Sequence, residues 1–123
     1  MAGYVAGTPS FSVVDISAII STNGKYEGAV LLPSGKVLFV PRNAEKVGLF
    51  DPATDTFSLV GPIIAGDDKY IGGVLLLSGK VVFVPSKARN VGVFDPATDA
   101  FTTVDISTST EVAKYRGCPH PQP

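Results

Sequence analysis

Nine polar side chains of the chain have the types and spacing that ligand recognition requires. They fall in four short segments, each next to an apolar run. Lysine and arginine donate charge-assisted hydrogen bonds, tyrosine and asparagine donate and accept neutral ones, and aspartate accepts. The set predicts a site for a small polar or anionic ligand, a carbohydrate among the candidates, or for polar side chains of a protein partner. The nine residues are Lys25, Tyr26, Arg42, Asn43, Asp68, Lys69, Tyr70, Arg89 and Asn90.

A structural interpretation of the same residues is simpler. The two Lys-Tyr pairs, at 25–26 and 69–70, occupy the same place in a repeated unit. In that interpretation the tyrosines pack between neighbouring units and the lysines remain in solvent. No ligand is then needed to explain the residues.

The acidic residues indicate turns more than catalysis. Asp-Pro at 51–52 and at 95–96 favours type I turns, because aspartate accepts backbone N–H bonds and proline presets φ at the next position. Asp67-Asp68 has the composition of a carboxylate pair sharing one proton, although adjacent loop aspartates are ordinarily both solvated. A calcium-binding loop of the EF type needs a longer acidic spacing that ends in glutamate, and the sequence has none.

The single cysteine and the single histidine, Cys118 and His120, lie in a proline-rich segment at 118–123. One of each does not make a zinc site within a chain, and only symmetry in an assembly would gather several. A lone histidine so placed supports no Ser-His-acid set. Gly72-Gly73 precedes a strand, not a helix, so it is no phosphate-binding motif. We therefore predict no catalytic residue, no metal site and no cofactor.

Composition limits the partners of this chain. It has 123 residues, 45% of them hydrophobic, and a net charge of −1. The near-zero charge predicts no attraction to nucleic acid or to an anionic membrane. No apolar run approaches the roughly 20 residues that span a bilayer. No lysine or arginine precedes the first apolar residues, which is unlike a signal peptide, and the cellular location stays open.

A repeated unit organises the sequence. Residues 25–63 and 69–107 align without a gap and are identical at 24 of 39 positions, with an offset of 44 residues. Residues 11–17 match 101–107 at five of seven positions, and residues 114–117 resemble the start of each unit. We therefore predict an N-terminal segment with a partial strand (1–24), two units (25–63 and 69–107), and a partial repeat with a proline-rich tail (108–123).

Each unit predicts four short strands. In the first unit four apolar runs, at 28–32, 37–40, 47–50 and 57–60, are too short for helices and rich in Val, Phe and Leu. Ser-Gly and Asp-Pro pairs separate them, as tight hairpins require. The first three runs are almost continuously apolar, which predicts burial on both faces. Four antiparallel strands with two apolar faces form the blade of a β-propeller, and a 44-residue offset suits such repeats.

The second unit resembles the kelch-type propeller repeats. The resemblance rests on Ser-Gly-Lys at 78–80, the strand that follows, and the run from Asn90 to Phe101 with its Asp-Pro-Ala-Thr turn. Where the family has Gly-Gly after the second strand, this chain has Val-Pro, and the family's tryptophan is Phe57 or Phe101. The resemblance implies a binding platform. Some family members are copper oxidases, and their ligand set has no counterpart here.

Two blades leave two apolar faces open, whereas propellers usually have four to eight blades. We therefore expect self-association head to tail into a ring, most simply a homotrimer with six blades. The alternative is that the sequence is a fragment of a longer array. In a blade, the loops before the first strand and between the second and third share one end, which collects the nine polar residues at a channel mouth.

Three functions are compatible with these features. The favoured one is a non-enzymatic module that binds a small polar ligand or a protein partner at the channel mouth. The second is a purely structural repeat protein without a ligand. The third is a hydrolase or lyase acting in the channel, which would need a carboxylate such as Asp68 beside Lys69 and Tyr70.

Overall fold

The computed structural model describes residues 10–106, and within them every regular element is a strand. The first four strands are β1 (Tyr26–Leu31), β2 (Val37–Pro41), β3 (Val47–Asp51) and β4 (Thr56–Val60). They form one antiparallel sheet in the order β1-β2-β3-β4. All four lie within the predicted first unit, and β1 begins two residues before the apolar run that predicts it.

The second unit repeats this architecture. Its strands are β5 (Tyr70–Leu75), β6 (Val81–Pro85), β7 (Asn90–Asp95) and β8 (Ala100–Asp105). They form a second four-stranded antiparallel sheet in the order β5-β6-β7-β8. The predicted fold class, all-β with two four-stranded antiparallel sheets of propeller-blade type, is therefore confirmed.

The hairpins form as their turn residues predict. Asp51 and Asp95 each accept a backbone N–H two residues on, at 3.0 Å from the nitrogens of residues 53 and 97. Gly35 and Gly79 adopt φ of +90° and +93°, a conformation that side chains disfavour. Each glycine N–H also donates to a carbonyl three residues earlier at 2.9 Å, which closes the turn.

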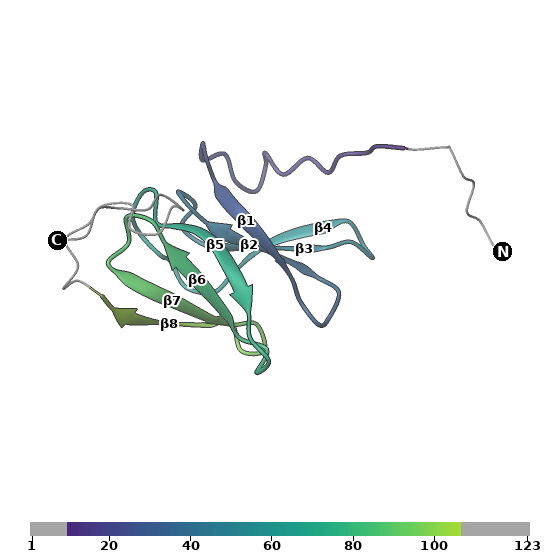
Figure 1. The fold of residues 1–123 in the computed structure, drawn as a ribbon. Helices are drawn as coiled ribbons and strands as arrows, with labels where there is room; N and C mark the ends of the chain where they lie inside the picture. The colour runs from purple at the N-terminus through teal and green to yellow at the C-terminus, as the bar shows by residue number, and fades with distance from the viewer. Residues whose placement is uncertain (1–9, 107–123) are drawn as a thin grey trace.

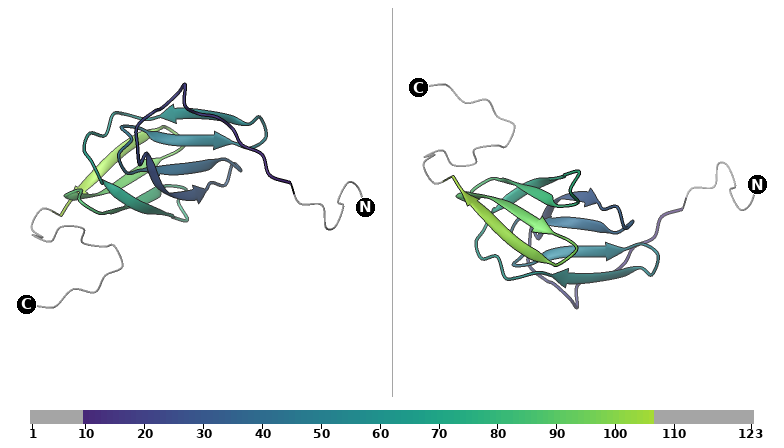
Figure 2. Two further views of the ribbon diagram at one scale, coloured as in Figure 1. Left: turned by 90° about the horizontal axis from the view of Figure 1, so that it is seen from above. Right: turned by 90° about the horizontal axis from the view of Figure 1, so that it is seen from below.

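The two sheets meet at their first strands. β5 contacts β1 and β2, while β4 and β8 are the outer strands of their sheets (Figure 1). The views in Figure 2 show the two sheets side by side, with faces that converge on β1 and β5. This fan-like arrangement buries one face of each sheet in a shared core.

Each sheet has one face rich in valine and one rich in aromatic residues, because facing residues of the antiparallel register lie on the same side. The valine face carries Val30, Leu38, Val40 and Val47 in the first sheet, and Val74, Val82, Val84 and Val91 in the second. The aromatic face carries Tyr26, Phe39, Phe50 and Phe57 in the first sheet, and Tyr70, Phe83, Phe94 and Phe101 in the second. Within the chain, the valine face of the first sheet packs on the aromatic face of the second.

The other two faces have no sheet against them in the described part of the chain. The prediction that the inner strands are buried on both faces is therefore met on one face only. Val30 is 7% exposed, whereas its counterpart Val74 on the second sheet is 55% exposed. The difference in exposure arises from what packs against each sheet, because the same residue type occupies the same place in both sheets.

Residues 11–17 form no strand, although the sequence predicts a partial one there. Ser12, Val14 and Ile16 border a hollow on the first sheet's aromatic face, which is also lined by Tyr26, Phe39, Phe50 and Phe57. The predicted partial repeat at 108–123, including Cys118 and His120, lies outside the described residues.

Candidate functional site

A polar network joins the two sheets at the end where the loops gather. The Arg42 guanidinium donates to the Asp68 carboxylate at 2.8 Å, and the Lys87 ammonium lies 3.4 Å from the other carboxylate oxygen. Arg42 also lies 3.6 Å from Glu27. The hydrogen bond from Arg42 holds the pKa of the Asp68 carboxyl below its usual range, and Lys87 acts in the same direction. Asp68 is thus held as an anion that ties one sheet to the next.

The backbone at Asp68 is part of the same network. Its φ of +49° lies in the left-handed region, which non-glycine residues seldom adopt. The Asp68 N–H donates to the Asn43 side-chain oxygen at 2.7 Å, and the Asn43 amide donates to the Asn23 carbonyl at 3.2 Å. Asn43 therefore fixes the loop that carries Asp68.

Lys69 is buried at the junction between the sheets, with only 3% of its surface exposed. Its ammonium donates to the Ala44 carbonyl at 2.8 Å and to the Gly66 carbonyl at 2.7 Å. Burial lowers the pKa of the Lys69 ammonium, and the nearby Asp67 and Glu45 carboxylates act in the opposite direction. The lysine acts as a cross-link between the loop of the first sheet and the linker that leads to the second.

A pocket of about 340 Å³ opens beside Lys69, between the linker and the β6–β7 loop. We call it the loop pocket. Its residues include Tyr70, Lys87, Arg89 and Asn90, and the Tyr70 hydroxyl donates to the Asn90 side-chain oxygen. Lys87 and Arg89 are exposed, so two cationic side chains border the pocket. Burial raises the pKa of Tyr70 to about 12, which keeps its hydroxyl protonated at neutral pH.

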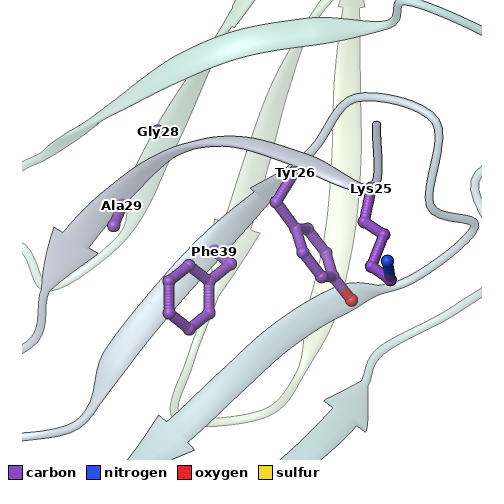
Figure 3. Close-up of a pocket in the computed structure, with 5 residues that line it drawn as sticks. All are labelled: Lys25, Tyr26, Gly28, Ala29 and Phe39. Carbon is purple, nitrogen blue, oxygen red and sulfur yellow. The ribbon is translucent and has the colours of Figure 1, made fainter. Parts of the chain in front are cut away.

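A second, more open hollow of about 530 Å³ lies on the aromatic face of the first sheet. We call it the Lys25 hollow, and it is lined by Lys25, Tyr26, Gly28, Ala29 and Phe39. Figure 3 shows Tyr26, Ala29 and Phe39 on the same side of the sheet, with Lys25 beside the tyrosine ring. The Tyr26 hydroxyl is shielded from solvent yet has no hydrogen-bond partner among residues 10–106. Burial raises the pKa of Tyr26 to about 12.

The structure therefore divides the nine predicted residues into three groups. Arg42, Asn43 and Asp68 belong to the polar network, and Lys69, Tyr70, Arg89 and Asn90 line the loop pocket. Lys25 and Tyr26 line the other hollow. Sequence reasoning missed Lys87 and Glu27. The repeat could have identified Lys87, because Lys87 is the counterpart of Asn43 in the second unit.

Within residues 10–106, no group of three or more His, Cys, Asp or Glu side chains is placed to hold a metal ion. The same range contains no helix long and apolar enough to cross a membrane. No protein-family model matches the chain, and no curated protein matches it either. The kelch-type resemblance therefore remains a prediction from the sequence.

Proposed function

We propose that this chain is a non-enzymatic propeller-type module that closes into a ring by head-to-tail self-association. The observation that carries the proposal is the unequal exposure of equivalent residues. Val30 and Leu32 on the first sheet are 7% and 5% exposed, whereas their counterparts Val74 and Leu76 on the second are 55% and 41% exposed. A second sheet covers the first pair, and nothing in residues 10–106 covers the other.

The exposed valine face is costly for a free chain. Burial of apolar surface contributes about 25 cal/mol per Å², so an uncovered face forgoes stabilisation that its counterpart receives. Large exposed apolar patches mark interaction surfaces. The first sheet has its own open face at the Lys25 hollow, so each chain offers two different surfaces. Contacts between unlike surfaces close a ring when the rotation divides the circle, and three chains would give six blades.

The loop pocket is the part of the proposed module that binds a ligand. Exposed Arg89 supplies positive charge, Lys87 shares its charge with Asp68, and the side chains of Asp67 and Asn90 add polar atoms. These groups suit a small polar or anionic ligand, such as a sugar or a sugar phosphate, or an acidic side chain of a protein partner. All the residues that line the pocket belong to one chain.

A structural role without a ligand is the second candidate. It is favoured because Arg42, Asn43, Asp68 and Lys69 are all engaged in contacts between the sheets. A catalytic role for Asp68 is less well supported, because its lowered pKa makes it a weak proton acceptor at neutral pH. An Asp68→Ala protein would test that role directly.

Two measurements test the proposal. Light scattering coupled to size exclusion should give a mass that is a multiple of the 12.8 kDa chain, and a monomer at all concentrations would refute the ring. Titration with a panel of neutral and phosphorylated sugars should show binding that Arg89→Ala removes. Lys80→Ala is the matched control, since Lys80 is exposed in a hairpin of the same sheet outside the loop pocket. Failure of every sugar to bind would favour the structural role.

A further inference from the structure

The glycines of β1 and β5 show how closely two neighbouring sheets approach each other. A Cβ atom added at Gly28 in β1 would lie 2.9 Å from the Cα atom of Gly72 in β5. Real Cβ atoms essentially never come that close to backbone, so a side chain at position 28 would push the sheets apart. Gly28 is therefore required by the junction inside the chain.

Gly72 is the counterpart of Gly28 in the second unit, and no close contact within residues 10–106 requires a glycine there. A Cβ atom added at Gly72 would meet no atom of those residues within 4 Å. Gly72 also lacks the positive φ that Gly28 has at +97°, so its backbone would accept a side chain. A glycine in a strand interior weakens the strand and marks a β-bulge or the close approach of another backbone. The β5–β6 register does shift between Tyr70 and Gly73, but without a positive φ that irregularity does not require glycine at position 72.

We propose that Gly72 receives strand β1 of a second copy of this chain, in the way that Gly28 receives β5. The valine face of the second sheet would then pack on the Lys25 hollow of the other copy. This contact between copies has the same arrangement as the junction inside one chain. Gly28 of the second copy packs against Gly72 of the first. The inference rests on the self-association proposed above and specifies its surfaces and register.

The polar groups of the hollow agree with this register. Lys69 is satisfied by the Ala44 carbonyl across the internal junction. Its counterpart Lys25 has no partner for its ammonium within residues 10–106, and the counterpart of Ala44 is Ala88. In the proposed contact, Lys25 of the second copy donates to the Ala88 carbonyl. The contact would bury Lys25 as Lys69 is buried.

Two differences make the contact between copies weaker than the internal junction. The ion pair between Arg42 and Asp68 has no counterpart, because serine and glycine stand at positions 86 and 24. A Cβ at Gly73 would lie 3.1 Å from both Val30 and Val40, and its counterpart in the other copy is Ala29. That methyl group makes a tight fit. Ser12, Val14 and Ile16 also border a hollow on the receiving face, so this segment must move aside where the second copy packs. The same hollow is lined by Tyr26, Phe39, Phe50 and Phe57.

The test compares the self-association of three variants by analytical ultracentrifugation. Gly72→Ala should raise the dissociation constant at least about tenfold, because the added methyl group clashes only in the contact between copies. Its Tm in dilute solution should be unchanged or higher. Ala29→Gly should lower the dissociation constant by removing the tight methyl group. Ser58→Ala, an exposed change on the outer strand β4, is the control and should change neither, because Ser58 pairs with Leu49 on the first sheet's valine face, away from both surfaces of the proposed contact.

The outcomes distinguish the proposed register at Gly72 from the more general proposal that the chain self-associates. If the native chain associates and Gly72→Ala associates equally well, the register is wrong while self-association stands. If the native chain is monomeric throughout, both fail. Should Gly72→Ala prove misfolded by circular dichroism, Val74→Lys replaces it, since Val74 is 55% exposed and a charge there disturbs only a partner. Unimpaired association of a folded Val74→Lys protein would overturn the register.

Discussion

Replacement of Lys69 by methionine is the sharpest single test of the junction between the sheets. The substitution keeps the length and apolar body of the side chain but removes the ammonium. The Ala44 carbonyl, at 2.8 Å from the ammonium in a buried position, would lose that donor. The Gly66 carbonyl, at 2.7 Å, is only partly buried and can turn to water.

The expected loss follows from these two contacts. An unsatisfied buried carbonyl costs about 1–3 kcal/mol, and a hydrogen bond from a charged donor contributes about 1.5–3 kcal/mol. Part of this is offset, because methionine removes the cost of burying a charge. We therefore expect Lys69→Met to lower the free energy of unfolding by about 2–4 kcal/mol, which corresponds to a fall in Tm of about 10 °C.

Urea unfolding followed by circular dichroism measures this change, with Lys25→Met as the matched control. Lys25 occupies the same place in the first unit, but its ammonium has no partner within residues 10–106. In dilute solution the control should lose less than about 0.5 kcal/mol, as surface substitutions do. Equal losses in the two variants would refute the claim that Lys69 acts as a cross-link.

Four further variants probe the pH dependence and the packing. The lowered pKa of Asp68 stabilises the fold above about pH 4, and this contribution is lost as the pH falls further. Asp68→Asn should therefore weaken the dependence of Tm on pH on the acid side, as measured by thermal melting. The raised pKa of Tyr70 has the opposite sign: its contribution is present below about pH 10 and is lost as pH rises toward 12, so Tyr70→Phe should reduce alkaline destabilisation in the same assay. Val40→Ala should lower the free energy of unfolding in urea by about 1–3 kcal/mol. The same change at its more exposed counterpart, Val84→Ala, should lower it by less than half as much. Equal losses would contradict the open valine face.

The fold was predictable from sequence because its signals are local. Short runs rich in valine and phenylalanine predict strands, and the Ser-Gly and Asp-Pro pairs between them predict hairpins through φ preference and side-chain hydrogen bonds. Both signals act within a few residues, so neighbouring sheets do not alter them. The small shifts at strand ends, such as the start of β1 at Tyr26, arise where pairing continues beyond the apolar run.

The site was less predictable because it depends on what lies beside each residue. Lys25 and Lys69 share the same Lys-Tyr-x-Gly sequence. Within residues 10–106, however, only Lys69 lies against another sheet and donates to two carbonyls. Arg42 and Asp68 are 26 residues apart and meet only after both sheets have formed. No local pattern contains either fact. The repeat could have identified Lys87, since it aligns with Asn43.

The hairpin order of each sheet has a consequence for how the chain folds. Every pair of hydrogen-bonded strands is adjacent in sequence. Each sheet can therefore form by closing short loops, which costs little conformational entropy. The contacts between the sheets join β5 to β1 and β2, and these require both sheets to be in place. We therefore expect the junction to form late, after the folding barrier. Changes at Gly28 or Lys69 would then accelerate unfolding while leaving the rate of folding almost untouched.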